Sequence, residues 1–172
     1  MPEFYGSVAG ADAYHTARAN AAWTGSDDAK QAALIRASAY IDGKYQQQNS
    51  CGRWESMFSG SKTGGRGQEL QWPRTGASDN EGATIPSSEV PAEIEKATYE
   101  AALRELVTPG SLSPDYVAAE AIKRQKVDVL EIEYQASTDG GVPTRPVLTV
   151  VDELVAPLLR SNRLCGVAVF VV

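Results

Sequence analysis

The sequence predicts a mainly α fold: a small bundle of about four helices with a long central loop, one β-hairpin and an extended C-terminal tail. Apolar residues recur at helical spacing in four stretches, and in one further stretch the period changes to two. Hydrophobic residues make up 42% of the 172 residues, which is enough for one core. We therefore expect a single domain over residues 1–172, with a loop at 46–89, a hairpin at 121–136 and a C-terminal arm at 164–172.

The first helix is expected at residues 9–20, where small and aromatic residues recur at helical spacing. It contains His15, the one histidine of the chain. Because no second histidine can share a metal ion or form a proton relay with it, we expect His15 to be an ordinary surface or half-buried residue.

The second helix is expected at residues 27–44. Ser26 is a suitable N-cap, and Asp27 and Asp28 fall in the first turn, where the helix dipole favours negative charge. One apolar stripe is expected to face the core, and it consists of Ala33, Leu34, Ala37, Tyr40 and Ile41. A second face of small residues consists of Ala32, Ile35 and Ala39. We expect this second face at an interface between subunits.

Residues 46–89 are rich in Gly, Ser, Gln and Asn and are predicted to form a long irregular loop. We expect Trp54, Trp72, Pro73 and Arg74 to make one ordered belt in this loop, because two tryptophans and a proline bury much apolar area at low entropic cost. Between residues 44 and 74, five basic residues stand against two acidic ones. Two interpretations remain open: the belt packs on the core of its own domain, or it docks on a partner or faces DNA.

The third helix is expected to begin near Pro91, with the proline at the first helical position, and to end at residues 108–110. Glu93, Lys96, Glu100 and Arg104 form one charged stripe, whereas the rest of the helix surface is mostly apolar. A helix of this kind is expected at the centre of a bundle or an assembly.

The hairpin is expected where Leu130, Ile132 and their neighbours alternate between apolar and polar residues. If residues 128–129 form the turn, Lys126 lies opposite Glu131 and Arg124 lies opposite Glu133. Both pairs would then bring opposite charges together across the strands, which favours this register.

The last helix is expected at residues 148–159, with a kink at Pro157, which lacks an N–H group and crowds the carbonyl of Glu153. The C-terminal arm is apolar and carries no charge, so it either packs on its own core or docks on a neighbouring protein. The residues expected to make the docking contacts are Val167, Val169, Phe170, Val171 and Val172.

The composition argues against several classes of function. The net charge is −6, which does not suit a general nucleic-acid binder. No apolar run approaches the ~20 residues of a membrane span, and residues 1–4 lack the pattern of a signal peptide. The two cysteines, Cys51 and Cys165, cannot build a disulfide framework or a four-cysteine zinc site. Known catalytic motifs are missing, so we expect a protein that is not an enzyme and that needs no cofactor or metal.

Several segments resemble a family of tailed-bacteriophage head-to-tail connector, or adaptor, proteins. The segments are residues 11–14, 32–42, 52–54, 71–76, 85–86, 90–94, 97–103, 126–134 and 154–159, and the most specific of them reads Gln-Trp-Pro-Arg-Thr-Gly at 71–76. Members of that family are often labelled DnaT-like single-stranded-DNA-binding proteins. This sequence departs from the family pattern in an insertion at 44–51 and in Asp128, where the family has a glycine.

The resemblance implies a structural protein of the virion neck that is present in the host cytoplasm during assembly. Its subunits would form a homo-oligomeric ring, commonly of twelve copies, that docks on the portal protein and joins the capsid to tail or neck proteins. Genomic DNA would pass through the channel of this ring with weak, non-specific contact, and no membrane would be involved.

The alternative is a single-stranded-DNA-binding protein, which needs aromatic side chains interleaved with basic ones. The basic residues that could face DNA are Arg53, Lys62 and Arg66 in the belt and Lys123, Arg124 and Lys126 in the hairpin. Because the protein as a whole is acidic, the sequence favours the connector, and any DNA affinity is expected to be weak, salt-sensitive and independent of sequence.

Overall fold

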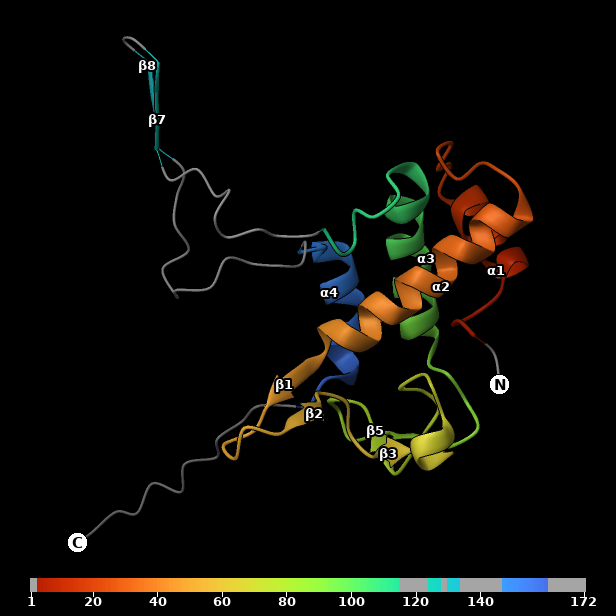
Figure 1. The fold of residues 1–172 in the computed structure, drawn as a ribbon. Helices are drawn as coiled ribbons and strands as arrows, with labels where there is room; N and C mark the ends of the chain where they lie inside the picture. Colours follow the sequence, from red (N-terminus) through yellow and green to blue (C-terminus); the bar gives the residue numbers. More distant parts are fainter. Residues whose placement is uncertain (1–2, 115–123, 128–129, 134–146, 161–172) are drawn as a thin grey trace, which may run out of the picture.

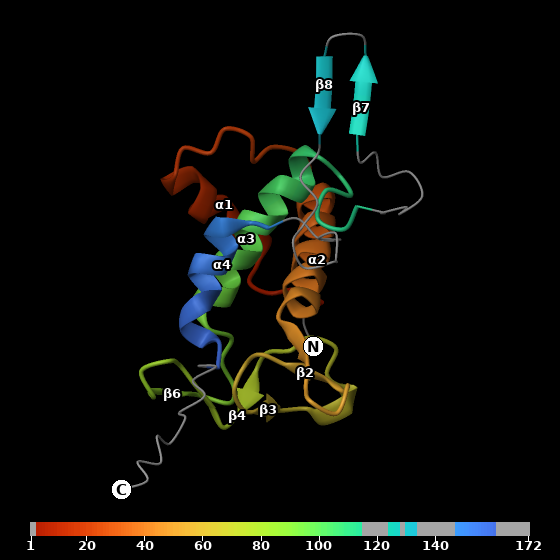
Figure 2. The same cartoon turned by 90° about the vertical axis from the view of Figure 1, so that its left-hand side faces the viewer.

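A computed structural model describes residues 3–114, 124–127, 130–133 and 147–160, and its described part is built mainly on four α-helices (Figure 1). These are α1 (Val8–Ala17), α2 (Asp27–Lys44), α3 (Ala92–Val107) and α4 (Thr149–Val155). Helix α3 contacts each of the other three helices, and it lies between α2 and α4 in the second view (Figure 2). The prediction of a mainly α fold is therefore confirmed, and so is the central place of the third helix among the described helices.

The start and the end of α2 agree with the prediction, because its N-terminus is capped as expected. The Ser26 hydroxyl accepts a hydrogen bond from the Ala29 N–H (3.3 Å), and Asp27 and Asp28 occupy the first turn. Helix α1 begins one residue earlier than expected, after Ser7, and ends at Ala17 rather than at residue 20.

Two prolines sit differently from the prediction. Pro91 is the residue that precedes the first turn of α3, not the first residue inside it. Helix α4 ends at Val155, and Pro157 lies in the tighter turn η3 (Ala156–Leu158) that follows. A proline cannot donate to the carbonyl four residues back, so the chain ends the α-helix before Pro157 instead of kinking it.

Residues 46–89 were predicted to form an irregular loop. In the structure they contain three short antiparallel strand pairs. Strand β1 (Gln46–Gln48) pairs with β2 (Trp54–Ser56), β3 (Ser61–Lys62) with β4 (Arg74–Thr75), and β5 (Ala77–Ser78) with β6 (Thr84–Ile85). These strands gather at one end of the helices (Figures 1 and 2). Strands of two or three residues are too short to show an alternating pattern, which is why the sequence does not reveal them.

The hairpin of β7 (Arg124–Val127) and β8 (Leu130–Glu133) has the predicted register. Arg124 pairs with Glu133 and Lys126 pairs with Glu131. The predicted turn at 128–129 and the flanking residues 121–123 and 134–136 lie outside the described residues, as does the predicted C-terminal arm at 164–172. The described strands thus place the two pairs of oppositely charged residues as direct partners, as predicted.

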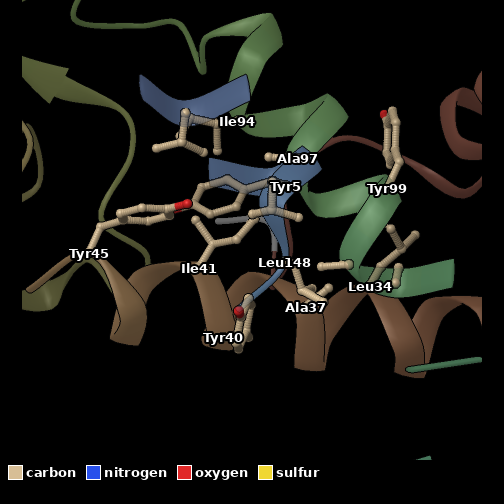
Figure 3. Packing of buried hydrophobic residues seen from close by; sticks show 14 of the residues in the cluster. Tyr5, Leu34, Ala37, Tyr40, Ile41, Tyr45, Ile94, Ala97, Tyr99 and Leu148 are labelled. Atoms are coloured by element: carbon tan, nitrogen blue, oxygen red, sulfur yellow. The ribbon is translucent and has the colours of Figure 1, made fainter. Parts of the chain in front are cut away.

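The core lies between α2 and α3. The predicted stripe of α2 is buried throughout, and Figure 3 shows Tyr5, Ile41 and Ile94 between the two helices. The second face of α2 lies outside this core: Ala32 and Ile35 are partly exposed and Ala39 is exposed. Its use as a subunit interface stays a prediction. None of the helices in the described ranges is both long enough and apolar enough to cross a membrane.

Candidate nucleic-acid interface

Trp72 anchors the loop region to the core. Its side chain is 2% exposed, and its ring packs against that of Phe58 at 5.6 Å between centroids. Phe58 is fully buried and packs in turn on Tyr45 at 5.7 Å. The Trp72 side chain is therefore part of the domain's own core and is not available to a partner.

Arg74 is also buried, at 3% exposure, and its guanidinium group binds the backbone of its own loop. Nε donates to the Ser59 carbonyl (2.7 Å) and Nη2 to the Gly60 carbonyl (2.7 Å), while Nη1 donates to the Gln71 carbonyl (3.2 Å) and side chain (2.9 Å). Burial lowers the pKa of this guanidinium group. Arg74 thus holds three loop carbonyls together and cannot contact a phosphate.

A buried hydrogen-bond network, which no sequence pattern indicates, joins this loop to α2. The Tyr5 hydroxyl donates to Asp42 Oδ1 (2.6 Å) and accepts from the Trp72 N–H (3.1 Å), and the Gln71 N–H donates to Asp42 Oδ2 (2.9 Å). Burial raises the pKa of the Asp42 carboxyl to about 6, and the hydrogen bonds from Tyr5 and Gln71 offset this rise only in part. One carboxylate therefore positions both Tyr5 and the segment that carries Trp72.

We expect the Asp42 carboxyl to titrate near pH 6 in an NMR experiment that follows its side-chain carbon. The folded state then binds this proton more tightly than the unfolded chain, in which an aspartate titrates near 3.8. The free energy of unfolding should consequently rise, by about 2 kcal/mol from this group, as the pH falls from 7 to 4.

Buried His15 acts in the opposite direction, because burial lowers its pKa. Comparison of the wild type with Asp42→Asn across the same pH range isolates the aspartate, since the variant should lose the rise on acidification. A titration midpoint at or below 4 for Asp42 would contradict the conclusion that burial outweighs the hydrogen bonds to this carboxyl.

The pair β1–β2, which with its turn spans residues 46–56, forms an arm that is fixed at its base. At the base, the Met57 N–H donates to the Tyr45 carbonyl (2.9 Å), and the Arg160 N–H donates to the Met57 carbonyl (2.8 Å). At the tip, the Asn49 side chain accepts hydrogen bonds from the N–H groups of Cys51 and Arg53, both at 3.0 Å. Both ends of the arm are therefore held by hydrogen bonds.

Trp54 lies on this arm and is 66% exposed, in contrast to the expectation that it shares one ordered belt with Trp72, Pro73 and Arg74. The physical reason is its position in β2, four residues before the buried Phe58, where the strand has already left the core. The predicted belt is thus divided into a buried part around Trp72 and an exposed arm around Trp54.

The basic residues expected to face DNA differ in their availability. Lys62 is partly buried and donates to the carbonyls of Gln68 and Glu69, both at 2.9 Å. Arg53 and Arg66 are exposed, and within the described ranges their guanidinium groups make no hydrogen bond or ion pair. Of the three basic residues of this loop that were expected to face DNA, only Arg53 and Arg66 are therefore available to a ligand.

In the hairpin, Arg124 and Lys126 stand opposite Glu133 and Glu131 in the register, and Lys123 lies outside the described residues. Two basic and two acidic positions face each other across the pair β7–β8, so the charges of these four residues sum to zero. The described strands of the hairpin are therefore a weaker candidate for phosphate contact than the arm.

His15 is fully buried, which corrects the expectation of a surface or half-buried residue. It is 1% exposed, and its Nε2 lies 3.1 Å from the Tyr99 carbonyl while its Nδ1 lies 3.0 Å from Nδ2 of Asn20. A carbonyl only accepts, so Nε2 carries the proton and Nδ1 accepts from Asn20. Nε2 thus joins α1 to α3, and Nδ1 joins α1 to the segment that follows it. Among the described residues, no three His, Cys, Asp or Glu side chains gather as metal ligands.

A hollow of about 500 Å³ lies at the C-terminal end of α3, away from the arm. Its lining is mostly apolar and includes Leu103, Val107 and Leu148, with one cation, Arg104, and one carboxylate, Glu100. The Glu100 carboxylate accepts a hydrogen bond from the Tyr14 hydroxyl (2.9 Å). This balance of charge does not suit a phosphate backbone, so the arm is the better candidate.

Comparison with known proteins bears on the two interpretations. The model of a family described as "Putative DnaT-like ssDNA binding protein" matches residues 3–171. The chain belongs to this family. No match is found among curated proteins or among solved structures.

Membership of the DnaT-like family corrects the assignment made from sequence segments. The resemblance to head-to-tail connectors is overturned by the family match, which covers nearly the whole chain and points to single-stranded DNA. The expected portal, tail and ring partners have no support beyond that resemblance. In the most specific of its segments, residues 71–76, Trp72 and Arg74 are buried in the chain's own fold, and this packing role does not identify a partner.

Proposed function

We propose that this protein binds single-stranded DNA weakly and without sequence preference, and that it is a binding protein rather than an enzyme. The observation that carries the proposal is Trp54, an exposed tryptophan adjacent to the exposed Arg53 on a fixed arm, in a chain that belongs to the DnaT-like family. Bases stack on exposed aromatic rings, and arginine contacts the neighbouring phosphates.

The described helices favour single-stranded over duplex DNA as the ligand. Helix α2 carries three acidic and three basic residues, and α1, α3 and α4 each carry more acidic than basic residues. A helix that enters the major groove is usually basic, because it lies between two phosphate backbones. The exposed tryptophan and arginine are instead on a strand pair, where they can meet a single strand.

The small number of available cations sets the expected strength. Arg53 and Arg66 are the two exposed arginines of the belt, against a net charge of −6 for the chain. Each phosphate neutralised on a single strand contributes about −0.7 to the slope of log K against log salt concentration, so two contacts give a slope of about −1.4. A shallow slope of this size distinguishes the proposal from a strongly basic DNA-binding protein.

The test is fluorescence anisotropy of a labelled dT oligonucleotide titrated with the full-length protein between about 50 and 200 mM salt. We expect weak binding with the slope given above, and a slope near zero for the double variant Arg53→Gln/Arg66→Gln. Arg104→Gln is the matched control, because it removes an exposed arginine on α3 and should leave the slope unchanged. Absence of binding to dT at the lowest salt concentration, or tighter binding to duplex DNA, would contradict the proposed function.

A further inference from the structure

We infer that Trp54, Gln48 and Arg53 form a site for one unpaired base and its phosphate. In this site the Trp54 indole stacks on the base, the Gln48 amide bonds to the base edge, and the Arg53 guanidinium group contacts the phosphate. This inference rests on the proposed binding of single-stranded DNA and assigns the residues that carry it out.

Strand pairing places Trp54 and Gln48 together. In the antiparallel pair β1–β2 they are direct partners, and partners across a ladder project from the same face. Both residues are exposed. Arg53 precedes Trp54 directly and is exposed at the end of the turn, so its long side chain starts one residue away from the indole.

The exposure of Trp54 sets it apart from the other tryptophans of the chain. Trp23 and Trp72 are both buried, and the Trp23 indole N–H donates to Asp12 (2.6 Å). Leaving an indole in water forfeits the free energy that its burial would contribute. A base supplies a flat apolar partner that covers this surface.

The charge on the arm is arranged so that this face meets no carboxylate of its own strands. Besides Trp54 and Gln48, the face includes Gln46 and Ser56, which are uncharged. Glu55, the one acidic residue of the two strands, projects from the opposite face, where its Oε1 accepts a hydrogen bond from the Gln47 amide at 3.3 Å. A base that stacks on Trp54 therefore meets polar amides and no carboxylate of these strands. Arg53, one residue away at the turn, is the cation that can reach the phosphate of the same nucleotide.

The ligand class follows from these side chains. An amide group both donates and accepts, so Gln48 can bond to the edge of any of the four bases. A base within a duplex is already paired and stacked and cannot place its face on Trp54 without being unstacked. The site should consequently bind single strands of any sequence and discriminate against duplex DNA.

The arm is ordered before it binds, which lowers the cost of binding. The hydrogen bonds at the base of the arm and in the Asn49 turn hold the strands in place in the absence of DNA. The tryptophan side chain has few rotatable bonds, so little conformational freedom is lost when a base stacks on it.

The test compares the full-length wild type with Trp54→Ala and Trp54→Phe on three probes: a dT oligonucleotide of about 15 residues, an abasic oligonucleotide of the same length, and the corresponding duplex. We expect Trp54→Ala to weaken binding to dT by about five- to a hundredfold, the range found for loss of one base-stacking aromatic residue. Trp54→Phe should restore part of the affinity, because it restores a ring. Binding to the abasic strand should be the same for all three proteins.

Tryptophan fluorescence gives a second readout in the wild type. Because Trp54 is exposed and Trp23 and Trp72 are buried, quenching on addition of dT reports mainly on Trp54. The inference is overturned if Trp54→Ala binds dT as the wild type does, or if it weakens binding to dT and to the abasic strand equally. If the wild type does not bind dT at all, the proposed function itself fails, which is a different result from either of these.

Discussion

The variant Trp72→Ala is expected to lower the free energy of unfolding by about 3–5 kcal/mol, as is typical for the loss of a fully buried tryptophan. Trp72 is 2% exposed and fills the space between Phe58 and the Tyr5–Asp42 hydrogen-bond network. Alanine would leave a cavity there that the surrounding structure cannot fill, because Phe58 is held in turn by Tyr45. Denaturation in urea at neutral pH, followed by circular dichroism, measures the loss.

The matched control for this prediction is Trp54→Ala, which removes the same side chain from an exposed position. Its effect on the unfolding free energy should stay within about 0.5 kcal/mol, because a substitution on the surface leaves no cavity. Trp72→Ala should thus lose stability in the urea experiment. Trp54→Ala should keep its stability but lose affinity for DNA. Equal losses of stability would show that the arm packs on the domain, contrary to the structure.

Arg74→Leu is expected to destabilise the protein by about 1–3 kcal/mol, the range for leaving buried acceptors without their donor. Leucine replaces part of the volume of the arginine stem but offers no donor. The carbonyls of Ser59, Gly60 and Gln71 would then lose the guanidinium group that holds them at 2.7–3.2 Å. The same urea denaturation measures this loss.

Arg53→Leu is the matched control for Arg74→Leu, because Arg53 is an exposed arginine of the same loop region. It should change the unfolding free energy by less than about 0.5 kcal/mol while weakening the salt dependence of DNA binding. If Arg74→Leu were as stable as Arg53→Leu, the hydrogen bonds of Arg74 would be mere surface contacts.

The parts of the fold that the sequence predicts are those with a local, repeated signal. Helix α2 has a capping serine, acidic residues in its first turn and one regular apolar stripe, so both its ends and its buried face could be inferred. The hairpin β7–β8 could be placed in register because two pairs of opposite charges coincide in one alignment only. Neither inference needed information from distant parts of the chain.

The candidate site could be predicted only in outline. Trp54 and Trp72 stand in the same aperiodic stretch. What separates them is that the Trp72 ring packs on Phe58 and that its N–H donates to Tyr5, which comes from a distant part of the chain. In the same way, nothing in the neighbourhood of Lys62 indicates that its ammonium group is bound to the carbonyls of Gln68 and Glu69. Residue type revealed that aromatic and basic groups were present, and tertiary contacts decided which of them reach the surface.

Glu105 illustrates a second limit. It lies next to the charged stripe of α3 and would be assigned to the surface by its type, yet it is buried. Its carboxylate accepts hydrogen bonds from Arg36 Nη1 (3.0 Å) and from the N–H groups of Gly110 (2.7 Å) and Leu112 (3.4 Å). The acceptor is needed because the chain turns back after α3, and that turn cannot be located from the helix pattern alone.

The attachment of the arm's base to residues 159–160 has a consequence for the order in which the protein forms during synthesis. Leu159 bridges to Phe58, and the Arg160 N–H donates to the Met57 carbonyl (2.8 Å). Each pair is separated by some hundred residues of chain, so the ribosome must translate through position 160 before these contacts can close. Strands β1 and β2 leave the ribosome early, but we expect them to stay unsecured until the last helix has emerged and folded back. A nascent chain stalled before residue 157 should therefore lack the contacts that attach the base of the arm to residues 159–160.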